Sequence, residues 1–131
     1  MKNLLMAVSI SALIVGCAAT PEQLSARSDD QLCKTYSDAR KVGGLIGDLG
    51  ASHLQEMQRR NLLSENELDL VKNRQVQRGM SLCALYASWG VPNKENRSVG
   101  RWGTRIQHVY GARYTRAYVY TENGIVTSWQ N

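Results

Sequence analysis

The spacing of hydrophobic residues follows a helical period through the first part of the chain. Residues 28–42, 46–61 and 64–71 place apolar side chains three or four positions apart, which predicts three short amphipathic helices. Gly43 and Gly44 predict the end of the first of these helices. The first half of the chain is therefore expected to be helical.

Serine residues mark the predicted starts of two of these helices. Ser28 precedes Gln31, and Ser64 precedes Glu67, at the spacing of a capping box. In this motif the serine hydroxyl and the side chain three residues later each accept a hydrogen bond from a backbone N–H at the helix start. Both sites predict a well-defined helix N-terminus.

A fourth helix is predicted at residues 82–89. Its apolar residues keep the helical spacing, and Ser81 stands at the N-cap position. Gly90, followed by Pro92, predicts its end, because proline cannot continue a helix and glycine readily adopts the C-terminal conformation.

The period changes to two after residue 105. Apolar and polar side chains alternate in residues 106–110, 117–121 and 125–129, as they do in half-buried strands. Asn123 and Gly124 separate the last two strands, and this pair favours a type I′ turn because both central positions need positive φ.

These elements predict an α+β fold. Short N-terminal helices precede one further helix and a three-stranded antiparallel meander, arranged as a two-layer sandwich. One face of the sheet would pack on the helices, and the other face or an edge would remain open to a partner.

The N-terminus has the pattern of a secretory signal. Lys2 is followed by an apolar run at residues 4–15, which is too short to span a bilayer stably, and then by Gly16 and Cys17. The tetrapeptide at residues 14–17 resembles a bacterial lipobox. This predicts a signal peptide at residues 1–16 and acylation of Cys17, which would hold the protein on a membrane. A plain secretory signal and a short uncleaved anchor are the alternatives.

The predicted domain organisation follows from this cleavage. Residues 17–27 would form a lipid-anchored linker, and residues 28–131 a single domain. The residue after Cys17 is Ala18. An aspartate at this position would resemble the inner-membrane retention signal of Gram-negative lipoproteins. The expected location is therefore the periplasmic face of the outer membrane.

Cys33 and Cys83 remain once Cys17 is assigned to lipid. An even number of cysteines in an oxidising compartment predicts a disulfide. It would close a loop of about fifty residues and stabilise the fold by roughly 3 to 4 kcal/mol. Two buried free thiols are the alternative, and the sequence contains no CxxC pattern that would favour a redox pair.

The chain carries a net charge of +5, and the basic excess concentrates after residue 93. Such a surface beside a membrane favours anionic partners, such as lipid headgroups, lipopolysaccharide phosphates or acidic proteins. The compartment argues against nucleic acid. A solvated face that serves solubility is the alternative. The basic residues in this part of the chain are Lys94, Arg97, Arg101, Arg105, Arg113 and Arg116.

The strongest candidate for a binding surface is the segment at residues 96–105, which is predicted to be a loop entering the sheet. Arginine and tryptophan are enriched at binding hot spots. Alternatively, the tryptophan closes an open end of the core and the arginines are solvated. The candidate partner-binding residues are Arg97, Arg101, Trp102, Arg105, Arg113 and Arg116.

Candidate catalytic residues are few. The two histidines, His53 and His108, show no spacing to a nucleophile and carboxylate that would favour a catalytic site. Glu56 lies three residues after His53, but one such pair is more typical of a solvated helix face than of a metal site. The sequence predicts no enzyme activity, no cofactor and no metal.

Four short motifs stand out in the second half of the chain: Gly79-Met80-Ser81, Trp89-Gly90-Val91-Pro92, Tyr110-Gly111 and the run from Tyr118 to Thr127. Together they resemble the SmpA/OmlA group of small outer-membrane lipoproteins, which includes a subunit of the barrel-assembly machinery. The resemblance covers residues 79–129 and implies helices followed by three strands and a non-enzymatic envelope role. Residues 79–131 would form the part similar to that group, and residues 28–76 a helical extension that could not be matched to that subunit.

These observations favour a lipid-anchored binding or scaffold module of the outer membrane that supports an envelope or barrel-assembly complex. A second hypothesis is a sensor or inhibitor that binds anionic lipid, lipopolysaccharide or peptidoglycan through its basic surface. A third is an enzyme, whose sign would be a perturbed histidine in a shaped pocket.

Overall fold

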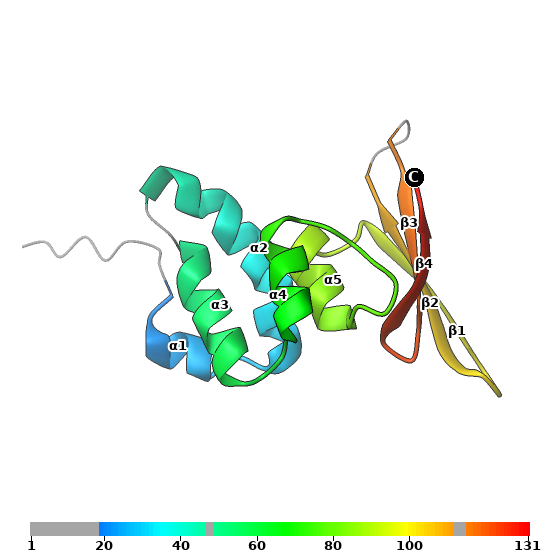
Figure 1. Ribbon diagram of the computed structural model, residues 1–131, viewed down its shortest axis with the longest axis horizontal. Helices are drawn as coiled ribbons and strands as arrows, with labels where there is room; N and C mark the ends of the chain where they lie inside the picture. The colour runs from blue at the N-terminus through cyan, green and yellow to red at the C-terminus, as the bar shows by residue number, and fades with distance from the viewer. Residues whose placement is uncertain (1–18, 47–48, 112–114) are drawn as a thin grey trace, which may run out of the picture.

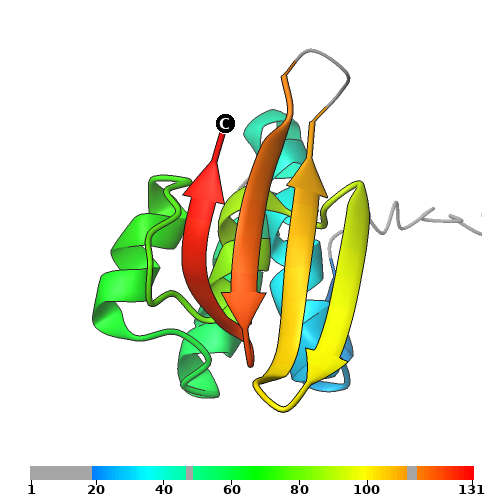
Figure 2. The same cartoon turned by 90° about the vertical axis from the view of Figure 1, so that its right-hand side faces the viewer.

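The computed structural model describes residues 19–46, 49–111 and 115–131. Within these ranges the chain forms five helices and one four-stranded antiparallel sheet. The helices all lie on one side of the sheet, and its other face is open (Figures 1 and 2). The α+β class predicted from the sequence is therefore confirmed.

The helices come first along the chain and the strands follow. The sheet has the order β1-β2-β3-β4, so each strand pairs with its neighbour in sequence. The helices are α1 (Pro21–Ser25), α2 (Asp29–Ile46), α3 (Leu49–Arg59), α4 (Glu65–Lys72) and α5 (Leu82–Trp89). The strands are β1 (Lys94–Gly100), β2 (Gly103–Tyr110), β3 (Ala117–Glu122) and β4 (Ile125–Gln130).

The predicted caps are present. The backbone N–H of Gln31 donates to Ser28 Oγ at 3.2 Å, and Gln31 Oε1 accepts from the Ser28 N–H. Ser64 and Glu67 form the same reciprocal pair at the start of α4. Ser81 caps α5, with its hydroxyl accepting from the N–H of Ala84. The local sequence therefore determines where these helices begin.

Two predictions about the helical part were wrong. Helix α2 continues through Gly43 and Gly44 to Ile46, because glycine in a helix interior costs only about 1 kcal/mol and does not remove a backbone hydrogen bond. The predicted linker at residues 17–27 contains α1, which begins with a capping box at Thr20. Leu24 of α1 is only 2% exposed, so this segment belongs to the folded domain.

The predicted count of three strands was also wrong, because residues 94–100 form the edge strand β1. Every side chain of β1 is exposed, so the strand has no hydrophobic alternation that a sequence pattern could detect. It pairs with β2 through its backbone, with Arg97 opposite Ile106. Charged side chains are common on such edges, where they discourage pairing with other chains.

Helix α5 joins the helical part of the molecule to the sheet. It packs on α2, α4 and β4, and Leu85 is fully buried. The Tyr86 ring meets His108 edge-on at 5.9 Å. Trp89 meets Tyr110 in the same way at 5.4 Å. The buried core thus runs through α5 from one layer to the other.

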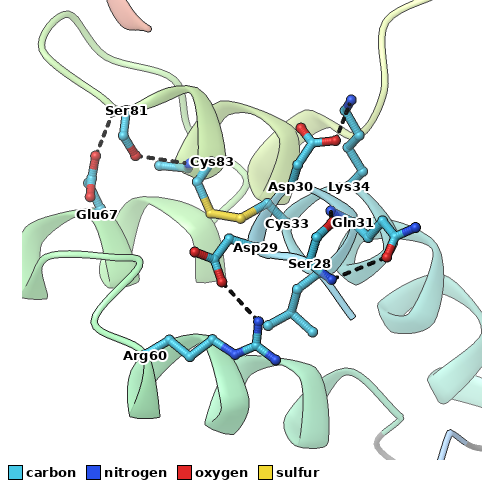
Figure 3. Close-up of a disulfide and its surroundings, with 12 residues drawn as sticks. Ser28, Asp29, Asp30, Gln31, Cys33, Lys34, Arg60, Glu67, Ser81 and Cys83 are labelled. Atoms are coloured by element: carbon cyan, nitrogen blue, oxygen red, sulfur yellow. Dashed lines mark hydrogen bonds and ion pairs between the residues drawn. A yellow bond between two sulfur atoms is a disulfide. The ribbon is translucent and has the colours of Figure 1, made fainter. Parts of the chain in front are cut away.

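A disulfide connects Cys33 of α2 to Cys83 in the first turn of α5 (Figure 3). The two Cα atoms are 5.1 Å apart, and 50 positions separate the residues in the sequence. Cys33 is 2% exposed. The predicted disulfide is therefore confirmed, and it ties α5 to the helical part.

Arg60 holds α1 and the start of α2 against the end of α3. Its guanidinium donates to Asp29 Oδ1 at 2.8 Å (Figure 3). It also donates to the backbone oxygens of Leu24, Ser25 and Arg27 at 2.8 to 3.1 Å. These carbonyls lie at the C-terminal end of the short helix α1, where backbone acceptors lack helical partners.

We expect the double variant Cys33→Ala/Cys83→Ala to lose about 3 to 4 kcal/mol of unfolding free energy, because its unfolded chain gains the entropy of a 50-residue loop. Urea denaturation of the oxidised protein and the variant measures the difference. Reductant should lower the stability of the wild type and leave the variant unchanged. A loss below about 1 kcal/mol would contradict the loop-entropy account.

Candidate functional site

The predicted binding segment is a β-hairpin, not a loop. Residues 94–100 and 103–110 pair as β1 and β2, with Gly100 opposite Gly103. Arg101 and Trp102 are the two residues of the turn. Gly103 adopts a φ of 98°, a conformation that side chains other than glycine rarely tolerate. The predicted loop is therefore corrected to two strands joined by a tight turn.

The end of this hairpin carries exposed apolar and basic side chains, and we name residues 99–105 the hairpin tip. Trp102 is 47% exposed and Val99 is 68% exposed. The Trp102 ring lies back over Gly100, where an added Cβ would come within 2.5 Å of it. The Arg105 guanidinium stands over the same ring at 4.8 Å. The alternative in which Trp102 closes the core is therefore wrong.

Neighbouring strands hold the hairpin tip in place. Arg105 Nε lies 2.6 Å from Glu122 Oε1 on β3. Asn123, in the turn between β3 and β4, accepts from the N–H of Thr104 at 2.9 Å and donates to the Trp102 carbonyl at 3.3 Å. The two turns lie at the same end of the sheet (Figure 2). The tip is thus a supported structure and not a free loop.

The structure separates the predicted partner-binding residues. The hairpin carries Arg97, Arg101, Trp102 and Arg105. Arg97 pairs with Ile106 and so shares its face of the hairpin. Arg105 precedes Ile106 on the same strand and therefore lies on the other face, because side chains alternate along a strand. Arg116 precedes β3 at the other end of the sheet. Arg113 and Cys17 lie outside the described residues. The described members of this set therefore do not form a single patch.

The open face of the sheet is polar. Asn96 on β1 donates to Gln107 on β2 at 2.8 Å, and Gln107 donates to the Tyr120 hydroxyl on β3 at 3.1 Å. Gln130 on β4 also donates to Tyr120, at 3.3 Å. This chain of hydrogen bonds crosses all four strands, so the face visible in Figure 2 is suited to water more than to an apolar partner.

His53 and Glu56, the one pair considered for metal binding, contact arginines. His53 Nε2 lies 3.0 Å from Arg27 Nη1. The Glu56 carboxylate accepts from Arg59 at 2.6 and 2.8 Å and from Arg60 at 2.7 Å. The hydrogen bonds from Arg59 and Arg60 lower the pKa of Glu56 to about 2. This carboxylate is therefore ionised and already committed to two guanidinium groups.

The strand register brings together a polar network that sequence spacing did not predict. His108 Nδ1 lies 3.0 Å from Glu95 Oε1, and His108 Nε2 lies 2.9 Å from Thr121 Oγ1. Tyr86 of α5 donates to the same Glu95 oxygen at 2.6 Å. The histidine tautomer with its proton on Nδ1 satisfies both contacts. Glu95 on the exposed edge strand is thereby bonded to β2 and α5.

The Glu95, His108 and Thr121 side chains have the order of a catalytic triad but not its access to substrate. His108 is fully buried and Thr121 is 1% exposed, whereas a nucleophile has to reach a substrate. Burial lowers the pKa of His108, even though Glu95 acts in the opposite direction. Burial and the bond to Glu95 raise the pKa of Tyr86. The network is best read as a link between β1, β2, β3 and α5.

The described residues contain neither a cluster of metal ligands nor a membrane-spanning helix. No three histidine, cysteine or acidic side chains in this part of the chain gather closely enough to hold a metal ion. No helix in residues 19–46, 49–111 and 115–131 is both long and apolar enough to cross a membrane. No protein-family model, curated protein or solved structure matches the chain.

We expect the unfolding free energy to fall as the pH drops below about 6.5. Burial in the folded state lowers the pKa of His108 from 6.5. As the pH falls, the unfolded chain therefore binds this proton before the folded state does. The contribution of neutral His108 to stability is present above pH 6.5 and is lost as the pH falls below it. One proton limits the slope to about 1.4 kcal/mol per pH unit. Urea denaturation between pH 5 and 8 measures this slope. The lowered pKa values of Glu56 and Glu67 affect stability at more acidic pH.

The variant His108→Gln tests the assignment, because it keeps a polar side chain of similar size and does not titrate. Its overall stability is expected to be lower, but its stability should no longer depend on pH in this way. An unchanged slope in the variant would show that another group causes the pH dependence.

Proposed function

We propose that the chain is a lipid-anchored lipoprotein on the periplasmic face of the bacterial outer membrane and acts as a non-enzymatic binding module. The lipobox-like residues 14–17 support the anchor. The Cys33–Cys83 disulfide supports an oxidising compartment. Helix α1 begins three residues after Ala18, so the folded domain would lie close to the membrane surface.

The observation that carries the binding role is the exposed hairpin tip. Trp102 and Val99 present apolar surface and Arg101 presents positive charge, on a hairpin end fixed by the Arg105–Glu122 ion pair and by Asn123. A rigid aromatic and arginine cluster loses little conformational entropy on binding and suits a partly acidic protein surface. The tip projects away from the helices in Figure 1, so a partner can reach it.

The resemblance to the SmpA/OmlA group supports a partner in the envelope, such as a barrel-assembly complex. The resembling residues 79–129 span α5 and β1 to β4. The helical extension packs on α5 and is bonded to it through Cys33. In this proposal the sheet supplies the partner surface, and helices α1 to α4 supply stability and position it above the membrane.

The anchor is tested by labelling cells with a clickable palmitate analogue. We expect the wild type to incorporate label and to sediment with outer membranes. The variant Cys17→Ala should lose the label, because it lacks the acceptor thiol, and should leave the outer-membrane fraction. Label retained in Cys17→Ala would contradict acylation at this residue.

The binding surface is tested by crosslinking in cells followed by mass spectrometry. We expect the wild type to capture an envelope protein and Arg101→Ala/Trp102→Ala to lose at least about 90% of that product, since a hot-spot tryptophan contributes 2 kcal/mol or more. Trp129→Ala is the matched control, because Trp129 on β4 is 44% exposed and lies outside the hairpin tip.

Two results would contradict this proposal. Equal losses in the tip variant and in Trp129→Ala would show that the hairpin tip is not the contact surface. Adducts with lipid or glycan alone would favour the ligand-sensor hypothesis over a protein-binding module. Both variants should be compared at equal protein level, with the disulfide verified as formed.

A further inference from the structure

A cleft lies at the end of the sheet opposite the hairpin tip, where the C-terminal part of α5 meets the end of β2 and the start of β3. Its volume is about 510 Å³, within the range of small-molecule sites. Trp89, Val91 and Tyr110 form an apolar part of its wall, and Arg40 and Arg74 line it with positive charge. Lys41 also lines it but is paired with Asp38 at 3.3 Å. None of the described residues that line it is acidic.

Arg40 carries a positive charge without a carboxylate partner in the described part of the chain. Its guanidinium donates to the backbone oxygens of Val71 at 2.7 Å and Ser88 at 3.2 Å. Its Cζ lies 5.2 Å from the Tyr36 ring centre. Neutral carbonyls satisfy these hydrogen bonds but do not neutralise the charge of this half-buried side chain. An anion in the cleft would compensate it.

Two buried polar atoms of cleft residues also lack partners. Among the described residues, neither Arg40 Nε nor Ser88 Oγ has a hydrogen bond, and Ser88 is 2% exposed. Buried groups of this kind are rare, because each costs about 1 to 3 kcal/mol. Both atoms belong to residues that line the cleft, and both are covered by protein.

The backbone of Arg74 is held in an uncommon conformation beside the cleft. Its φ is 55°, a region that residues other than glycine and asparagine seldom occupy. The indole N–H of Trp89 donates to the Arg74 carbonyl at 3.0 Å. The positive φ belongs to the C-terminal motif of α4, in which the N–H groups of Arg74 and Gln75 donate to the carbonyls of Val71 and Leu70. The bond from Trp89 fixes this backbone next to an aromatic residue.

We propose that this cleft binds a small carboxylate with an aromatic or similarly flat apolar body. The carboxylate would lie toward Arg40 and Arg74, and the apolar body would lie against Trp89 and Tyr110. A bare inorganic anion would use the charge and leave the aromatic wall exposed, whereas a neutral aromatic molecule would leave Arg40 uncompensated. The inference is independent of the hairpin tip and of the envelope partner proposed above.

The test is an NMR titration of the full chain with its disulfide formed, in nonionic detergent. The reporter is the indole N–H signal of Trp89, assigned with Trp89→Phe. Phenylacetate is the probe, phenylacetamide is its neutral counterpart, and inorganic phosphate is the bare anion. We expect a saturable shift with phenylacetate and binding at least about tenfold weaker with the other two, the equivalent of one charge-assisted hydrogen bond.

The variant Arg74→Gln should weaken phenylacetate binding about tenfold. Arg78→Gln is the matched control, because Arg78 is exposed on the same segment and does not line the cleft. Trp102→Ala should bind phenylacetate as the wild type does. The proposal is overturned by the absence of a saturable shift, by equal binding of the amide or phosphate, or by equal affinity of Arg74→Gln and Arg78→Gln.

Discussion

The packing of α5 between the helices and the sheet is the interaction on which the rest of the structure depends. An eight-residue helix is marginal in isolation, so its stability comes from its neighbours. Cys83 is bonded to α2, and Ser81 donates to Glu67 of α4 at 2.6 Å. Tyr86 and Trp89 contact β2 through their rings. Covalent, polar and aromatic contacts thus meet at one short helix, which packs on the other helices and on the sheet.

This arrangement gives the two ends of the sheet different roles. At the end near Trp89, α5 covers the strands and a positively charged cleft forms between them. At the other end the β1 and β2 hairpin extends past the helices and exposes Trp102. The edge strand β1 has no buried side chains, yet Glu95 connects it to His108 and Tyr86. This polar network therefore holds the exposed edge strand against β2 and α5.

The sequence contained the local signals of the fold but not its long-range contacts. Capping residues and the Asn123-Gly124 turn act within a few positions, and both turn residues have positive φ as expected. The disulfide was predictable because two cysteines remain once Cys17 is assigned to lipid, with two buried free thiols as the alternative. Strand β1 was missed because hydrophobic alternation reports burial, and this strand buries no side chain. The Glu95, His108 and Thr121 network depends on strand register, and the cleft combines residues from Ser37 to Ala117. Neither has a signature in local sequence.

The most direct test of the central role of α5 is native-state hydrogen exchange of the oxidised protein. If α5 unites the two layers, the slowest amides of α2, α5, β2 and β3 should exchange with one common free energy, equal to that of global unfolding. A sheet whose slowest amides exchange at a clearly lower free energy than those of α2 and α5 would contradict the account, because the strands would then open as a unit of their own.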